Sequence, residues 1–266
     1  MPMNATAAKL PSSSVRAARI LIVFWLMGWL LKWTFFKPYL FETIVGYPYL
    51  IDFFPPFFRS AHVAQLFYML PLLSLPVFIR PLKLYFYCAA VLMLISSAML
   101  LLHQDMCNDA TFVTSFWVSV WFLWFVRHMH RQDDDFYAHA RSLALCVIGM
   151  IFWGGFIGKL TPEYWSGRVL ADIFMQQNWV GVGSWVRSHA SEPTIRFGFQ
   201  WVAKMIILGE GMLALSPVWP YRLVCWVGIP FMLGISLFTT WLIFSVLFCL
   251  MGLLFAGLQL KSSKVH

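Results

Sequence analysis

One lysine lies where an apolar segment ends, among residues that could give its amine unusual chemistry. Lys159 follows the glycine-rich run Gly154-Gly155-Phe156-Ile157-Gly158 and precedes Tyr164 and Trp165. Burial among apolar groups lowers the pKa of a lysine, and a neutral amine can act as a general base. The three glycines would let a neighbouring helix or a flat ligand approach closely. The alternative is structural, because a lysine at the C-terminal end of a helix stabilises the helix dipole and extends to the lipid headgroups.

Three more ionisable residues, Lys32, Lys204 and Glu210, fall inside apolar runs. Such residues usually face the interior of a helical bundle and mark functional sites. Lys204 and Glu210 are six residues apart, about 240° around a helix, so they do not face each other. We expect a structural ion pair between helices, in which Lys32 or Lys204 meets Glu210; a substrate site is the alternative. Lys32 is also close enough to the end of its run to reach the headgroups.

Two polar clusters separate apolar runs. Residues 103–109 contain nitrogen, oxygen and sulfur donors but match no metal motif, so we interpret them as an outer loop in which Asn108 or Asp109 caps the next helix. Residues 127–135 and His139 mix histidines, arginines and three aspartates, as a solvated cytoplasmic loop does. A di-iron membrane oxygenase would need several histidine boxes, and the chain has only seven histidines.

The elements that must position these residues are membrane-spanning helices. The chain has 266 residues, of which 61% are hydrophobic and 11% charged, whereas soluble domains are about half apolar and a quarter charged. A span needs about 20 apolar residues. We therefore predict an all-α, polytopic bundle of about 8 spans that forms a single integral membrane domain. The apolar runs are 20–36, 62–79, 84–102, 110–126, 142–158, 197–215 and 223–258, the last divided near Thr239.

Loop charges predict the orientation in the membrane. With both termini cytoplasmic, eleven of the nineteen basic residues lie on the cytoplasmic side, including those of a polar N-terminus (1–19) and a short basic tail (259–266). Lys159 is then at the outer face. We expect the inner membrane of a bacterium. The net charge of +8 is scattered between apolar runs, so no nucleic-acid partner is expected.

Two outer loops are long and rich in aromatic residues. The segment 37–61 contains Phe-Phe-Pro-Pro-Phe-Phe at 53–58 and is too apolar for a free loop, and the segment 159–196 contains three tryptophans, as interfacial segments do. We expect both to lie in the interface and to roof a cavity between helices. The five cysteines are widely spaced with no CxxC pair, so neither a disulfide framework nor a metal site is indicated.

The sequence Gly158-Lys159-Leu160, followed by Trp165-Ser166-Gly167, resembles the motif of the HTTM family, the membrane domain of vitamin K-dependent γ-glutamyl carboxylase and its bacterial relatives. DoxX-type membrane proteins are more distantly similar. The resemblance implies a quinol cofactor and makes Lys159 the base that deprotonates it. Asn108 and Asp109 stand where the family usually has an Asn-His pair. Glu210 resembles a glutamate of a late family helix.

The chain also departs from that family. An aspartate, Asp109, replaces the histidine, and the large extracytoplasmic domain of the carboxylase has no counterpart, so peptide carboxylation is not expected. The first hypothesis is a membrane enzyme acting on a quinol or other lipid-soluble ligand. The second is a non-catalytic, DoxX-like subunit that scaffolds a membrane protein partner. In the first, the catalytic residues are Lys159, Asn108 and Asp109, and the ligand-binding residues are Trp165, Gly158, Glu210 and Lys204.

Overall fold

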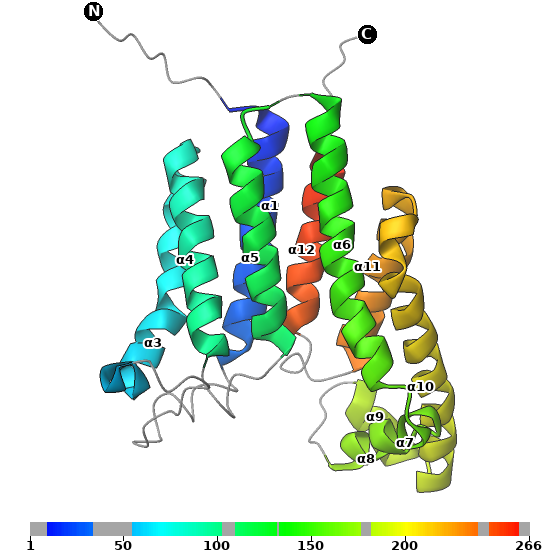
Figure 1. Ribbon diagram of the computed structural model, residues 1–266. Coiled ribbons are helices and arrows are strands. Elements are labelled where there is room, and N and C mark those ends of the chain that lie inside the picture. The colour runs from blue at the N-terminus through cyan, green and yellow to red at the C-terminus, as the bar shows by residue number, and fades with distance from the viewer. Residues whose placement is uncertain are drawn as a thin grey trace, which may run out of the picture. The chain divides into compact units, whose positions relative to one another are not determined.

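All the regular secondary structure of the described residues is helical. The computed structural model describes residues 10–33, 55–102, 110–131, 133–176, 182–238 and 245–260. These residues form eleven α-helices and three short 3₁₀ helices, and no strand occurs among them (Figure 1). The all-α prediction is confirmed. The chain divides into two compact units, Met1–Ala144 with Ser245–His266, and Leu145–Phe244. We call them unit 1 and unit 2.

Unit 1 is built mainly from helices that cross its full height. α1 and α12 lie side by side in opposite directions, with the rings of Phe24 and Phe255 5.2 Å apart, and α4 packs against α5 (Figure 1). The elements are α1 (Ser12–Leu31), η2 (Pro56–Arg59), α3 (Ala61–Met69), η3 (Leu70–Phe78), α4 (Lys83–Leu101), α5 (Ala110–His128), the first part of α6 (Asp134–Gly158) and α12 (Ser245–Gln259).

The core of unit 1 contains a column of aromatic rings. Trp25 and Trp29 stack at 4.6 Å, and Trp29 stacks on Tyr68 at 5.3 Å. Trp29 Nε1 donates to the Tyr68 carbonyl at 2.8 Å, while the Tyr68 hydroxyl donates to the Trp29 carbonyl at 2.6 Å. Because their polar hydrogens are satisfied, these rings can be fully buried without loss of hydrogen bonding.

Basic residues join the helices at one end of unit 1. The Arg19 guanidinium donates to the carbonyls of Val77 and Phe78 at the end of η3. Lys83, at the start of α4, donates to the Arg127 carbonyl at the end of α5, at 3.0 Å. Cations stabilise the unpaired carbonyls at helix C-termini. Arg19 and Lys83, two of the basic residues that we predicted to be cytoplasmic, therefore bind C-terminal carbonyls of neighbouring helices.

Unit 2 is organised around two antiparallel helices, the second part of α6 and α10 (Glu192–Ala214) (Figure 1). The hydroxyl of Ser216 donates to the Leu145 carbonyl at 2.9 Å, and Gly155 lies against Glu210. α10 continues past the end of α6, and α7 and α8 pack on this extension (Figure 1). The elements are the rest of α6, α7 (Pro162–Trp165), α8 (Arg168–Gln176), α9 (Val182–His189), α10 (Glu192–Ala214), η4 (Ser216–Val218) and α11 (Tyr221–Phe238).

All the predicted apolar runs are helical where they are described, but the count of about 8 spans is not confirmed. Within the described ranges, three helices are long and apolar enough to cross a membrane: α1, α4 and α6. The run 62–79 is not one α-helix, because Pro71 and Pro76 turn its second half into the 3₁₀ helix η3. The run 223–258 forms two helices, α11 and α12, and its predicted division near Thr239 lies outside the described residues.

Two helices begin earlier than the apolar pattern predicted. α1 begins at Ser12 and α6 at Asp134, each about two turns before its apolar run. In α6 the cause is local, because Asp133 Oδ1 accepts from the Phe136 backbone N–H at 2.7 Å and caps the helix. The aspartates of the first turn also favour the positive end of the dipole. The segment from Asp134 to His139, predicted to be a loop, is therefore helical.

Candidate functional site

The candidate site is an ion pair at the end of α6. Lys159 Nζ lies 2.9 Å from Oε1 and 2.8 Å from Oε2 of Glu210, which projects from α10. The carbonyl of Gly155, one turn earlier in α6, accepts from the same amine at 3.3 Å. An ammonium has three N–H donors, so these three acceptors use all of them. The Lys159 and Glu210 side chains are only 23% and 11% exposed.

Glycines allow the two helices to bring this pair together. A Cβ added at Gly155 would lie 3.2 Å from Glu210 Oε2, and one added at Gly211 would lie 3.0 Å from the Phe156 ring. On the other face of α10, a Cβ at Gly209 would overlap the Phe231 ring of α11 at 2.1 Å. Glycine on both sides of Glu210 thus lets α10 pack closely against α6 and α11 at the same level.

The remaining glycines of the motif are open. A Cβ at Gly154 or Gly158 would meet no described atom within 4 Å. These two residues lie one turn apart, on a part of α6 where Trp153 and Ile157 are about half exposed. The close helix approach that we expected at all three glycines therefore occurs at Gly155 alone. Beside it, α6 presents an open surface with exposed apolar side chains.

Tyr164 is the aromatic neighbour of the pair. Lys159 Nζ lies 5.6 Å from the centroid of its ring. Thr161 positions Tyr164, because its Oγ1 accepts from the Tyr164 N–H at 3.3 Å and Pro162 begins the short helix α7. Burial raises the pKa of Tyr164 well above its usual range, and the Glu210 carboxylate raises it further. The Tyr164 hydroxyl thus keeps its proton at neutral pH.

Gly167 fixes α7 and α8 against α10. Its φ is +75°, the left-handed region that glycine adopts without steric cost. A Cβ there would lie 2.5 Å from the backbone N and Cα of Gln200 in α10. A side chain is excluded at Gly167 by both its conformation and its neighbour. The structure thus explains why the sequence motif ends in a glycine at position 167.

The structure corrects one of the predicted contacts. Glu210 pairs with Lys159, and not with Lys32 or Lys204. Lys204 places its amine 4.8 Å from the centroid of the Trp201 ring. Lys32 ends α1 in unit 1 and is 2% exposed, so it does not reach out to the headgroups.

The other predicted site residues either lie near the Lys159–Glu210 pair in the chain or fall outside the described residues. Trp165 ends α7 and is 47% exposed, one residue beyond Tyr164. Gly158 is the last residue of α6 and belongs to the open surface. Asn108 and Asp109 lie outside the described residues.

Sequence reasoning did not assign Tyr164 or the Gly155 carbonyl to the site. The signal for Tyr164 is the sequence Thr161-Pro162-Glu163, a typical helix start. A helix that starts there turns the chain back, so that Tyr164 can approach Lys159. No sequence pattern distinguishes the Gly155 carbonyl, since every residue has one.

No family model, curated protein or solved structure matches this chain. The likeness to the HTTM family therefore depends on the quoted residues alone.

Proposed function

We propose that this chain is a multi-pass bacterial inner-membrane protein of about eight spans, with both termini cytoplasmic, whose ion pair at Lys159 carries quinol-dependent chemistry at the outer face. The proposal extends the resemblance to the membrane domain of vitamin K-dependent carboxylase. The carrying observation is the contact of Lys159 with both oxygens of Glu210 at the end of α6. The joined basic helix ends of unit 1 support the orientation.

The surroundings of the pair fit a flat, apolar ligand. The open surface at Gly154 and Gly158 has no side chain to hold a ring away from the helix. Trp153 and Ile157 provide exposed apolar surface next to it. A quinol ring placed there would meet apolar atoms on its face and the Lys159–Glu210 pair at its edge.

The chain's own residues would handle one proton. Bound quinol would supply a hydroxyl proton and the electrons for reaction with oxygen. Lys159 must be neutral to take that proton. Its own extra proton can first pass over 2.8 Å to Glu210, giving an amine and a carboxylic acid. Removal from water disfavours the two charges and so favours this neutral form. Lys159 then takes the hydroxyl proton, and the uncharged Tyr164 covers the pair.

One observation favours a second function, that of a non-catalytic subunit. All three donors of the Lys159 ammonium are already used by Glu210 and the Gly155 carbonyl. A pair satisfied in this way can simply join α6 to α10 while the protein scaffolds a membrane partner. The large exposed side chains of α10 and α11, such as Met205 and Trp226, would then be surface for lipid or for that partner.

Mass spectrometry of organic extracts from purified protein separates the two functions. For a quinol site, we expect one quinone per chain in the wild type and none in Lys159→Ala. Lys83→Ala is the matched control, a lysine at a helix end that donates to a carbonyl. Absence of quinone from every sample, together with an identified membrane partner at equal stoichiometry, contradicts the quinol site and supports the scaffold.

The double variant Lys159→Met/Glu210→Leu distinguishes the roles further. It replaces an ion pair by apolar side chains of similar size, which often preserves stability. If the pair only joins α6 to α10, the double variant should fold and should still bind the partner. If the pair transfers the quinol proton, the double variant should lose quinone-dependent oxygen uptake while the protein stays folded.

A further inference from the structure

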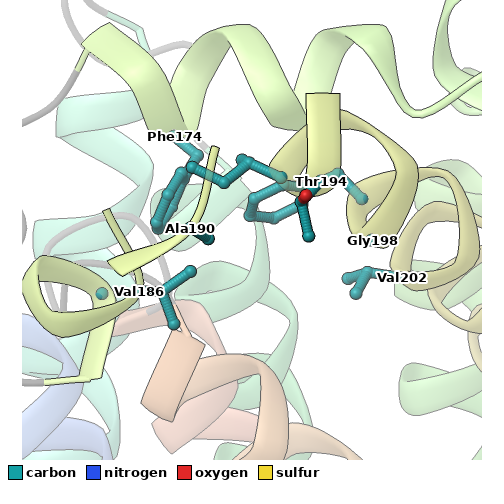
Figure 2. A pocket seen from close by; sticks show the side chains of 9 residues that line it. Phe174, Val186, Ala190, Thr194, Gly198 and Val202 are labelled. Carbon is teal, nitrogen blue, oxygen red and sulfur yellow. The ribbon is translucent and has the colours of Figure 1, made fainter. Parts of the chain in front are cut away.

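Unit 2 contains two apolar pockets that lie away from the ion pair. The smaller has a volume of about 210 Å³ and lies between α8, α9 and α10. Figure 2 shows its side chains, among which only Thr194 carries a polar atom. Val186 lines it from α9 and Gly198 from α10 (Figure 2).

The larger pocket adjoins the first. It has a volume of about 400 Å³ and lies between α8, α10 and α11. The two pockets share Phe174, Phe199 and Val202, and the rings of Phe174 and Phe199 lie 4.9 Å apart where the pockets meet. None of the described residues that line the two pockets is charged. The two spaces form an elongated apolar slot, whose shape and chemistry suit a hydrocarbon chain.

A cation lies beside this slot. Trp201 lines the larger pocket and is 57% exposed, and Lys204 Nζ lies 4.8 Å from the centroid of its ring. Among the described residues, Lys204 has no carboxylate partner, whereas Lys159 and Arg196 each form ion pairs. The positive charge at the edge of the slot is therefore available to an anionic group.

The position of Lys204 along α10 fits a headgroup. Lys204 precedes Glu210 by six residues, or about 9 Å of helix, toward the end where α7 and α8 pack. α8 and α9 are short helices with exposed Trp185 and Arg168 side chains, as interfacial helices have. An amphiphile with its chain in the slot would place its head beside Lys204.

We propose that the slot binds an anionic phospholipid of the surrounding bilayer, with one acyl chain between α8, α10 and α11 and the phosphate beside Lys204. The proposal depends on the membrane setting and on the slot, and not on the chemistry at Lys159. Trp201 contributes an apolar face to the chain and holds the Lys204 amine through its ring. The exposed apolar stripe of α10, which includes Phe197 and Leu208, gives the chain access from the bilayer.

Two glycines allow the slot to be filled without disturbing the fold. A Cβ at Gly234 in the larger pocket, or at Gly198 in the smaller, meets no described atom within 4 Å. The variants Gly234→Leu and Gly198→Leu should therefore fold and occupy space that the acyl chain needs. Gly154→Leu is the matched control, since Gly154 is equally open but lines neither pocket.

The test is lipid retention by the full chain. Protein in nanodiscs that contain equal amounts of phosphatidylglycerol and phosphatidylcholine with the same acyl chains is extracted, and retained lipids are counted by native mass spectrometry. We expect one phosphatidylglycerol per chain in the wild type and in Gly154→Leu, and none in Gly234→Leu or Gly198→Leu. Lys204→Gln should lower the preference for phosphatidylglycerol about fivefold, and Lys204→Arg should keep it.

Three outcomes overturn the proposal. Equal retention of phosphatidylglycerol and phosphatidylcholine by the wild type would exclude headgroup selection by Lys204. Unchanged lipid retention in both Gly234→Leu and Gly198→Leu would exclude binding of the acyl chain in the slot. Recovery of a single-chain carboxylate, and of no phospholipid, shows that the slot takes a different class of anionic amphiphile.

Discussion

The two units of the chain differ in the size of the side chains that they bury. In unit 1 the largest fully buried side chains include Trp25, Trp29 and Phe112, and Trp29 packs on both of the other rings. In unit 2, Trp226 is 79% and Met205 is 68% exposed. The core of unit 1 contains large stacked rings, whereas the fully buried side chains of unit 2, such as Ile207 and Met232, are smaller, and its helices approach most closely at glycines. A single substitution should therefore act through cavity formation in unit 1, and through one ion pair or one glycine in unit 2.

The largest expected effect is in the core of unit 1. Trp29→Ala should lower the free energy of unfolding by about 4 kcal/mol, because it removes a buried ring and the Nε1 donor to the Tyr68 carbonyl. Two buried thiols report on the units separately, Cys249 in unit 1 and Cys225 in unit 2. With the other cysteines replaced by serine, maleimide should label Cys249 faster in Trp29→Ala and Cys225 at an unchanged rate.

The control for that experiment is Trp226→Ala, which truncates an exposed ring. It should change stability by no more than about 0.5 kcal/mol. Equal acceleration at both thiols in Trp29→Ala would show that the units unfold together, and the contrast between them would then be one of packing alone.

The next effect tests the dependence of unit 2 on a single glycine. Gly167→Ala should lower the free energy of unfolding by about 3 kcal/mol, because it adds left-handed strain and a clash with the Gln200 backbone. Gly154→Ala is the control and should raise stability by about 1 kcal/mol through better helix propensity. Thermal unfolding in detergent measures both. Equal melting temperatures for the two variants are incompatible with the observed geometry of Gly167.

A somewhat smaller effect is expected at the ion pair. Glu210→Gln removes the negative partner of a lysine that is only 23% exposed, and should cost about 2 kcal/mol, below the range for fully buried pairs. We expect it to harm folding more than it changes the affinity of any ligand. A double-mutant cycle with Lys159→Met in chemical denaturation measures the coupling. Normal expression and stability with loss of quinone would instead assign Glu210 to ligand binding.

The smallest effect concerns pH. Since burial raises the pKa of Tyr164 in the folded protein, the tyrosine of the unfolded chain ionises first. Stability from this group is fully present below about pH 10, the ordinary tyrosine pKa, and declines as the pH rises further. Tyr164→Phe should flatten the decline of the melting temperature between pH 9.5 and 11. An identical decline in both proteins would mean that other groups cause it.

Much of the fold could be predicted from the sequence, because long apolar runs with few charges specify helices in a membrane protein. Helix starts were less predictable. The first turns of α6 are acidic, and the cap of Asp133 outweighs their polarity. The second half of the run 62–79 became 3₁₀ because of its prolines, a local backbone effect that hydropathy does not register.

The site was predicted in part. Lys159 and Glu210 were each identified as ionisable residues in apolar surroundings, but their pairing was not. Both lysines that we expected to meet Glu210 were chosen from within apolar runs, whereas Lys159 terminates one. Which residues meet depends on the level at which two antiparallel helices overlap. Contacts such as that between Gly155 and Glu210 set this level, and the period of each helix alone does not.

The winding of η3 changes how far its part of the chain reaches. A 3₁₀ helix rises about 2.0 Å per residue, so its nine residues extend about 18 Å, and the nine residues of α3 add about 14 Å. The sum, about 32 Å, slightly exceeds the roughly 30 Å of a bilayer core, whereas a plain α-helix of the same 18 residues would extend only about 27 Å. Pro71 and Pro76 thus lengthen a short segment. A count of spans that assumes α-helical rise would miss a crossing built in this way.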